Sequence, residues 1–163
     1  MTGVVQLRDV LPSDLEIFFR HQLDPEATRL AAFPARDRPA FMAHWTRILA
    51  DRANTIRTIL IDGEVAGNIV AFQQAERQLV GYWVGRDYWG QGIATQALTL
   101  FLHLVAARPI YAFVAKHNPA SIRVLQKCGF VVCAEDLAGS RAVDDDVEEV
   151  LLRLEADGSP TPG

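Results

Sequence analysis

Apolar residues change their spacing along the chain and so separate helical from extended segments. Ser13, with Glu16 three positions later, has the capping-box pattern ahead of an apolar run, which predicts the start of a first helix. Pro39 precedes apolar residues spaced three and four apart, which predicts a second helix after a loop at residues 30–38. Two β-branched runs around Asp62-Gly63 then predict a hairpin.

The second half of the chain alternates strand, helix and strand. A strand at residues 78–84, a helix that starts near Gly92 and a strand at residues 110–114 favour a parallel, right-handed crossover. Asn118 can cap a further helix, with Pro119 in its first position. The pattern predicts an α/β fold with a mixed sheet of about seven mainly antiparallel strands, flanked by about four helices. The expected strands are residues 4–8, 58–61, 65–72, 78–84, 110–114, 130–134 and 148–155.

Length and composition are those of one compact domain. A chain of 163 residues, half of them hydrophobic and 22% charged, is ordinary for a globular protein. We expect a single domain at residues 1–155 and a disordered tail at residues 156–163, where glycine, serine and proline are frequent.

Charge and residue usage exclude several classes of partner. The net charge of -4 supplies no general field for a phosphate backbone, so nucleic acid is not expected as a partner. The N-terminus lacks a signal-peptide core, and no run reaches the roughly 18 apolar residues of a membrane span, so we expect a cytoplasmic protein without a membrane partner. Cys128 and Cys133 lack zinc-ligand spacing, and no metal site is expected.

The connection from the strand at residues 78–84 to the next helix carries Tyr88-Trp89-Gly90-Gln91-Gly92-Ile93-Ala94. Its two glycines let the backbone approach a bound group closely, and the free N–H groups at the helix start lie at the positive end of the helix dipole. This combination binds phosphate. The segment lacks the Lys-Ser/Thr of a P-loop and the three-glycine spacing of a dinucleotide site, so ATP and NAD are not expected. Alone, it is equally consistent with an ordinary tight turn.

A second segment, one strand further along, changes how this turn is interpreted. It reads Asn118-Pro119-Ala120-Ser121-Ile122-Arg123-Val124-Leu125-Gln126-Lys127-Cys128-Gly129-Phe130. The succession of Tyr82-Trp83-Val84, the glycine turn, Asn-x-x-Ser and Lys-x-Gly-Phe is similar to the GNAT acetyltransferase family. Within that family it resembles the branch containing the ribosomal-protein N-terminal acetyltransferases. The match covers residues 79–130, about a third of the chain.

The resemblance implies a cosubstrate and its place in the fold. The central parallel pair of strands would be splayed apart, with the pantetheine arm of acetyl-CoA lying in the splay. The pyrophosphate would rest on the backbone amides from Gln91 to Thr95. The residues implied to contact the cofactor are Trp83, Val84, Trp89, Gly90, Gln91, Gly92, Ile93, Ala94, Thr95, Asn118 and Ser121.

The resemblance also implies catalytic groups. Acyl transfer needs a donor for the carbonyl oxygen as it becomes an oxyanion, and by family position that donor is the backbone N–H of Val84. Many members place a tyrosine general acid on the helix after Asn118, where this chain has Leu125, and Ser121 is the substitute we name. Gln96 stands where the branch commonly has a glutamate.

We therefore expect an N-acetyltransferase that moves an acetyl group from acetyl-CoA to a primary amine by direct attack in a ternary complex. The amine would belong to a small molecule or to a peptide or protein N-terminus. Leu125 and Gln96 keep open a catalytically silent acyl-CoA-binding sensor or interaction module, and a purely structural domain is a third reading. The oligomeric state stays open between monomer and homodimer.

Several candidate residues have an ordinary structural interpretation as well. Asn118 is also a helix cap, Ser121 also a first-turn solvent contact, and Tyr82 and Trp83 also sheet-packing residues. Arg123 and Lys127 are four apart on the last helix, where they could meet cofactor phosphates, although a solvated helix face is the default interpretation and they are left out of the expected site.

Overall fold

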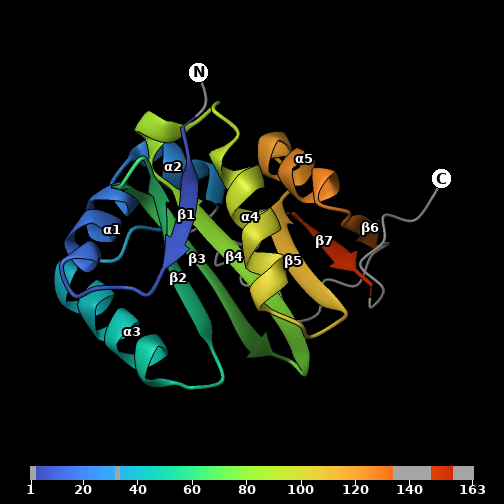
Figure 1. The fold of residues 1–163 in the computed structure, drawn as a ribbon, viewed down its shortest axis with the longest axis horizontal. Helices are drawn as coiled ribbons and strands as arrows, with labels where there is room; N and C mark the ends of the chain where they lie inside the picture. The colour runs from blue at the N-terminus through green and yellow to red at the C-terminus, as the bar shows by residue number, and fades with distance from the viewer. Residues whose placement is uncertain (1–2, 32–33, 134–147, 156–163) are drawn as a thin grey trace.

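The structure is a computed structural model that describes residues 3–31, 34–133 and 148–155 (Figure 1). The segment between the last two predicted strands, at residues 135–146, and the predicted tail at residues 156–163 lie outside the described residues. No helix in the described ranges is long and apolar enough to cross a membrane.

A seven-stranded mixed sheet forms the centre of the molecule. Its strands lie in the order β1-β2-β3-β4-β5-β7-β6, and every neighbouring pair is antiparallel except β4 and β5. The predicted sheet and its parallel pair are thus confirmed. The strands are β1 Val5–Arg8, β2 Thr55–Ile61, β3 Glu64–Gln74, β4 Arg77–Val84, β5 Ile110–Ala115, β6 Val131–Cys133 and β7 Glu149–Leu154.

Five α-helices and one 3₁₀ turn surround this sheet where the chain is described. Four of the helices correspond to predicted ones, and α2 was missed: the expected loop at residues 30–38 in fact begins within its last two residues. A seven-residue helix has too few turns to show a clear apolar period. The helices are α1 Asp14–Gln22, α2 Pro25–Ala31, α3 Arg38–Ala50, α4 Ile93–Leu104 and α5 Pro119–Lys127, with the 3₁₀ turn η1 at Arg86–Tyr88.

The capping box predicted at the start of α1 is wrong. Ser13 makes no side-chain capping bond, and the Asp14 carboxylate instead accepts from the Leu11 N–H at 2.8 Å and from the Thr58 hydroxyl of β2 at 2.7 Å. Burial raises the pKa of Asp14, but the hydrogen bonds from Arg8, Leu11 and Thr58 outweigh it and hold the pKa below its usual range. The buried carboxylate therefore fastens α1 to the sheet.

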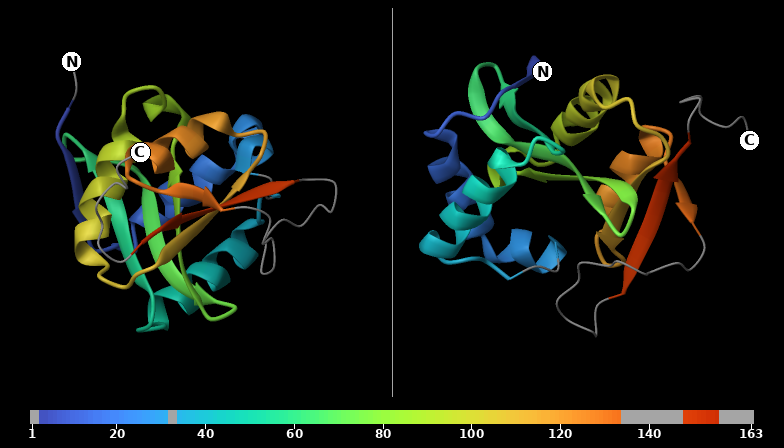
Figure 2. Two further views of the ribbon diagram at one scale, coloured as in Figure 1. Left: turned by 90° about the vertical axis from the view of Figure 1, so that its right-hand side faces the viewer. Right: turned by 90° about the horizontal axis from the view of Figure 1, so that it is seen from below.

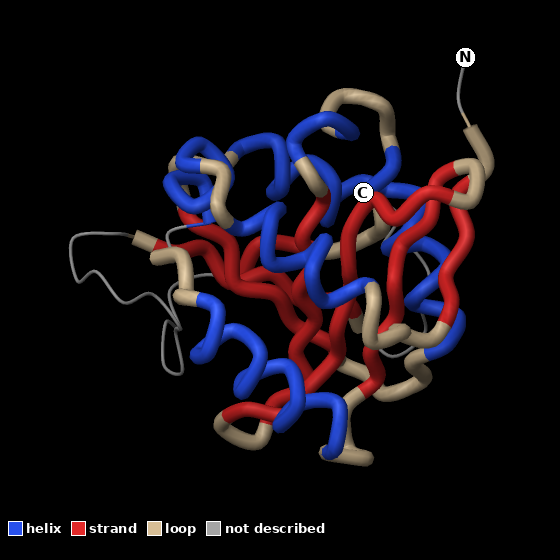
Figure 3. Tube along the Cα trace, turned by 90° about the vertical axis from the view of Figure 1, so that its left-hand side faces the viewer, coloured by secondary structure: helices blue, strands red, loops and turns tan. Residues whose placement is uncertain are grey.

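Helices cover both faces of the sheet (Figures 2 and 3). On one face, α4 and α5 pack on the main apolar cluster, which includes Leu98, Phe101 and Leu125. On the other face, α1 and α3 pack through Phe18 and Trp45, whose ring centroids are 5.0 Å apart. The sheet is therefore the middle of three layers.

The two halves of the sheet separate at its centre. β4 and β5 pair only at Gln78–Ile110 and Leu79–Tyr111, near the start of each strand. Beyond these pairs the strands diverge, so the last residues of β4 face β5 without ladder pairing. This divergence confirms the predicted splay, and it places the end of β4 beside an opening in the sheet.

Candidate functional site

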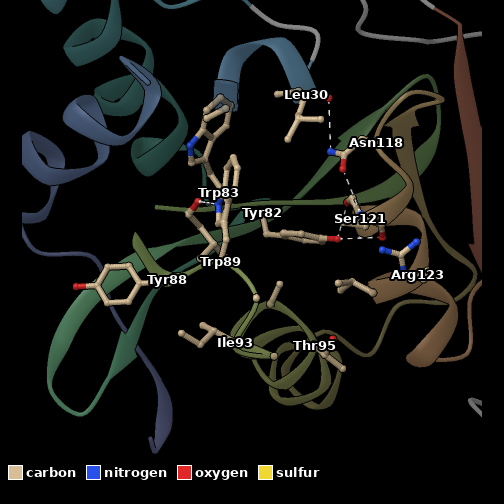
Figure 4. A pocket seen from close by; sticks show the side chains of 18 of the residues that line it. Leu30, Tyr82, Trp83, Tyr88, Trp89, Ile93, Thr95, Asn118, Ser121 and Arg123 are labelled. Atoms are coloured by element: carbon tan, nitrogen blue, oxygen red, sulfur yellow. Dashed lines mark hydrogen bonds between the residues drawn. The ribbon is translucent and has the colours of Figure 1, made fainter. Parts of the chain in front are cut away.

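Two pockets open on opposite faces of the sheet and meet at the splay. The first, the glycine-turn pocket, has a volume of about 430 Å³ and lies between the start of α4 and the start of α5 (Figure 4). The second, the aromatic pocket, has a volume of about 260 Å³ and reaches from the splay under α1 and α3, where Phe18, Phe41 and Trp45 line it. The residues that line both are Leu30, Ala31, Tyr82, Trp83, Asn118 and Ser121.

The glycine turn has the backbone that its sequence requires. Gly90 and Gly92 have φ angles of 77° and 76°, in the left-handed region that favours glycine. Gly92 is the N-cap of α4, so the first amides of that helix point out at the turn. A Cβ added at Gly90 would meet no protein atom within 4 Å. The turn therefore has free N–H donors at the start of α4 and open space beside Gly90.

Val84 ends β4 opposite Gly67 of β3. The Gly85 N–H donates to the Ala66 carbonyl at 2.8 Å, and hydrogen-bonded and non-hydrogen-bonded pairs alternate along an antiparallel ladder. Gly67 and Val84 are therefore a non-hydrogen-bonded pair, and the N–H and C=O of Val84 point away from β3. The Val84 carbonyl accepts from Trp89 Nε1 at 2.8 Å. Its N–H is accordingly directed into the splay, as an oxyanion donor would have to be.

Ser121 has a partner that the sequence did not reveal. Its Oγ lies 2.7 Å from the hydroxyl of Tyr82, which reaches it from β4 (Figure 4). Burial raises the pKa of Tyr82 to about 12, although the hydrogen bond with Ser121 lowers this pKa in part. Tyr82 is thus a neutral phenol at physiological pH, and it joins Ser121 where the two pockets meet.

The shifted pKa of Tyr82 predicts a loss of stability at alkaline pH. The unfolded chain ionises this hydroxyl near pH 10 and the folded chain only near pH 12, so the free energy of unfolding decreases as the pH rises through this window. At pH 11.5 the decrease is about 2 kcal/mol. Denaturant unfolding at pH 9 and pH 11.5 measures it, and Tyr82→Phe should lose less than the wild type by about this amount. Equal losses in the two proteins would contradict the assignment.

The start of α5 is held by α2. The Asn118 side chain caps α5 by accepting from the Ser121 N–H at 3.3 Å, and its Nδ2 donates to the Leu30 carbonyl at 3.5 Å. Next to it, Nε2 of His117 lies 2.6 Å from the Arg29 carbonyl. The cap interpretation of Asn118 is confirmed, and the helix that sequence reasoning missed forms one wall of both pockets.

Two cations that were interpreted as a solvated face also line the glycine-turn pocket. Arg123 and Lys127 lie on α5 and line this pocket together with Thr95 at the start of α4, and Figure 4 shows Arg123 beside Ser121. Arg123 and Lys127 are four residues apart, and residues four apart lie on the same side of a helix. Their spacing therefore allowed the sequence to place both on one face of the helix that follows Asn118. They supply positive charge beside the amides of the turn.

The structure brings most of the predicted cofactor residues together, with two exceptions of detail. Gln91 does not line the pocket, and its side chain instead donates to the Asp87 carbonyl at 3.3 Å. The Ile93 side chain is packed in the core, so only its backbone is suited to contact a ligand. The predicted residues that line the glycine-turn pocket are Trp83, Val84, Trp89, Gly90, Gly92, Ile93, Ala94, Thr95, Asn118 and Ser121.

The described residues contain no group of three or more His, Cys, Asp or Glu side chains placed to hold a metal ion. Cys128 and Cys133 are free and half-buried. Burial raises the pKa of the Cys128 thiol, against the effect of its contact with Thr99, so it is poorly suited to act as a nucleophile.

Several solved structures with similar folds are acetyltransferases. Spermidine N-acetyltransferase from Vibrio cholerae, in complex with CoA and spermine, matches with a TM-score of 0.77 and 14% identity over 94% of this chain and 96% of its own. RimL, a ribosomal L7/L12 alpha-N-protein acetyltransferase in complex with coenzyme A, matches with a TM-score of 0.76 and 19% identity over 98% and 97%. A GNAT-family acetyltransferase from Bacillus anthracis matches with a TM-score of 0.79 and 13% identity over 96% and 98%. These likenesses establish the fold.

Sequence comparison gives the family. A search of curated proteins found no match. The family model described as "Acetyltransferase (GNAT) domain" matches residues 5–131, which include β1 to β5, the glycine turn and α5. This range is more than half of the chain and contains all the residues that line the two pockets. The chain therefore belongs to the GNAT acetyltransferase family.

Proposed function

We propose that this protein is an N-acetyltransferase that transfers the acetyl group of acetyl-CoA to a primary amine by direct attack within a ternary complex. The observation that supports this most strongly is the pair of pockets that open on opposite faces of the sheet and meet at Tyr82, Trp83, Asn118 and Ser121. Two substrates can enter from opposite sides and touch only at the splay. This arrangement suits a ternary complex, because neither substrate has to leave before the other binds.

The glycine-turn pocket is the proposed site of acetyl-CoA. Backbone N–H groups at a helix N-terminus favour a pyrophosphate, and the amides following Gly90 and Gly92 are placed for this role. Arg123 and Lys127 add charge that phosphate groups would neutralise. The acyl end of the cofactor then lies in the splay, beside the Val84 N–H.

The proposed reaction needs a neutral amine nucleophile. Its nitrogen lone pair attacks the thioester carbonyl, a C–N bond forms, and the carbonyl electrons move onto oxygen, where the Val84 N–H stabilises the charge. The C–S bond then breaks as the carbonyl re-forms, and the sulfur leaves with the electron pair. The nitrogen loses a proton and the sulfur gains one, so the products are an N-acetyl amide and free CoA. No covalent enzyme intermediate is involved.

Ser121 is the proposed proton donor to the leaving sulfur, and Tyr82 supports it. A phenol is a stronger hydrogen-bond donor than an aliphatic hydroxyl, so Tyr82 donates to Ser121 Oγ across their 2.7 Å contact. The Ser121 proton is then free to point into the pocket. Because a thiol with a pKa near 8.5 leaves tolerably well unprotonated, this pair accelerates the reaction without being indispensable.

Within the family, we place the chain in the branch containing the ribosomal-protein N-terminal acetyltransferases. The support is the Trp89-Gly90-Gln91-Gly92-Ile93-Ala94 turn, in which backbone amides and not a charged first residue would contact the pyrophosphate. This placement concerns the donor site. The acceptor is argued below from the aromatic pocket.

Thiol release from acetyl-CoA, measured with a panel of small amines and peptides, tests the proposed activity. We expect CoA to raise the melting temperature and at least one amine to release thiol with stoichiometric N-acetylation. CoA binding without turnover with any amine or acyl-CoA would favour the silent acyl-CoA-binding module. Absence of CoA binding would contradict both functions.

A further inference from the structure

The aromatic pocket carries information on the acceptor that the glycine turn does not. Its floor is apolar and aromatic, formed by Phe18, Phe41 and Trp45 below the sheet and by Phe113 of β5. An apolar cavity of roughly 150 Å³ holds a benzene molecule. The volume of about 260 Å³ therefore accommodates one aromatic ring with a short chain, but little more.

Positive charge lies at one side of this pocket. Arg36 lines it, and the Gln22 side chain fixes the Arg36 backbone by accepting from its N–H at 2.7 Å and donating to its carbonyl at 2.9 Å. Burial, and then the charge of Arg47, lower the pKa of Arg36. The Arg36 guanidinium remains protonated at neutral pH. The pocket therefore contains a positive charge on a backbone segment that Gln22 holds in place, and the charge of Arg47 repels it.

His44 of α3 adds a donor to the same side. It lines the pocket, and its Nδ1 lies 3.1 Å from Nη2 of Arg47. A guanidinium can only donate, so Nδ1 accepts and a neutral His44 carries its proton on Nε2. With Nδ1 used as an acceptor, the other ring nitrogen of a neutral His44 is a donor.

Asn68 supplies a further polar group from the sheet. It lies on β3 opposite Trp83, is 9% exposed and lines the pocket. Its side-chain amide makes no hydrogen bond to another residue in the part of the chain that the structure describes. The amide has both a donor and an acceptor, so it is suited to bind a polar group of a ligand in the pocket.

Acidic side chains are absent from the described lining of the aromatic pocket. A polyamine acceptor, such as the spermine bound to the Vibrio cholerae enzyme, is a polycation and needs carboxylates to replace its hydration. Arg36 and Arg47 would repel it. The pocket has the opposite charge preference, since a cation and N–H donors lie at the side of an aromatic floor.

We propose that the acceptor is a small aromatic or apolar primary amine that carries a carboxylate, with the carboxylate bound by Arg36 and the ring on the Phe18, Phe41 and Trp45 floor. Asn68 and His44 complete the polar contacts, and the amine faces the splay at Tyr82 and Trp83. This inference rests on the proposed acetyl transfer, because it names the substrate class of the same site.

Four amines test the proposal, three of which form a series that differs only at the carboxylate. L-phenylalanine carries the ring, the amine and the carboxylate. L-phenylalaninamide has an uncharged amide in place of the carboxylate and represents a peptide N-terminus, and phenethylamine has neither carboxylate nor amide. Spermidine is a polycation without a ring. We expect kcat/KM for phenylalanine to exceed that for each of the others by about tenfold or more, the effect of one hydrogen bond to a charged group. Equal or faster acetylation of the amide, phenethylamine or spermidine would overturn the proposal.

Arg36→Gln links this preference to the pocket. The substitution should reduce kcat/KM for phenylalanine to the level of phenylalaninamide, while the value for phenylalaninamide itself stays within about twofold. Arg52→Gln is the matched control, since Arg52 is exposed and lies outside both pockets but removes the same charge. A preference that survives Arg36→Gln, or that is lost equally in Arg52→Gln, would refute the role of Arg36.

Calorimetric binding separates failure of this inference from failure of the proposed function. Binding of phenylalanine to the CoA-loaded protein, lost in Arg36→Gln, would support the pocket assignment even if no amine were acetylated. Turnover with cationic amines, together with no binding of phenylalanine, would leave acetyl transfer intact and overturn the inference alone.

Discussion

Replacement of Gly92 by valine is expected to weaken CoA binding about a hundredfold. Gly92 has a φ of 76°, and a β-branched residue there is a strained outlier that costs about 1–3 kcal/mol. The backbone relieves this strain by turning away, which moves the amides at the start of α4 from the pocket. Those amides are the main proposed ligands of the pyrophosphate, beside the charges of Arg123 and Lys127, so the loss should appear in the Kd for CoA, measured by calorimetry, and in the KM for acetyl-CoA.

Gly63 provides a matched control for this variant. It has a φ of 84° in the β2–β3 turn, and an added Cβ would meet no atom within 4 Å there. Gly63→Val therefore carries a similar backbone cost, but Gly63 does not line the glycine-turn pocket. Both variants should be destabilised in denaturant unfolding, and only Gly92→Val should lose CoA. Comparable loss of CoA in the two would mean that the effect is one of general stability.

Ser121→Ala and Tyr82→Phe should each lower kcat by about a hundredfold, the lower end of the range for a positioned proton donor. The two hydroxyls lie 2.7 Å apart and act as one unit in the proposed reaction. The double variant should consequently be little slower than either single variant, because removing one member already breaks the pair. Steady-state kinetics with saturating acetyl-CoA measure this, and the KM for acetyl-CoA should change by less than about threefold.

Tyr111→Phe is the control for loss of a tyrosine hydroxyl from the central strands. Tyr111 lies on β5, packs in the small cluster with Leu79 and Phe113, and lines neither pocket. Its loss should leave kcat unchanged. Additive effects of Ser121→Ala and Tyr82→Phe would show that the hydroxyls act separately, and an unaltered kcat in both would remove them from the mechanism.

The central sheet and the glycine turn could be predicted because their signals are local. Alternating apolar residues and the Asp62-Gly63 turn determine a hairpin from a few adjacent positions. Gly90 and Gly92 before an apolar helix announce the left-handed backbone that the structure contains. The cap at Asn118 and the proline after it are equally local.

The remaining parts of the site depend on contacts between distant segments, which no local pattern records. Tyr82 and Ser121 are 39 residues apart, and only the splay brings them together. Leu30 approaches Asn118 across 88 residues, from a helix too short to show a period. Nothing in the sequence around Arg36 distinguishes it from an ordinary surface arginine. Its position beside aromatic residues follows from the way α1 and α3 pack on the sheet.

Because β4 and β5 form only two residue pairs, the proposed cofactor is expected to contribute to the stability of the folded protein. Two residue pairs join the halves of the sheet, and the glycine-turn pocket extends from β4 to α5, across the rest of that boundary. A ligand that binds only the folded chain, present at 100 times its Kd, adds about 2.7 kcal/mol to the free energy of unfolding. Differences of this size change the abundance of a protein in the cell several-fold. On the proposed function, a cell short of acetyl-CoA would accordingly hold less of this protein.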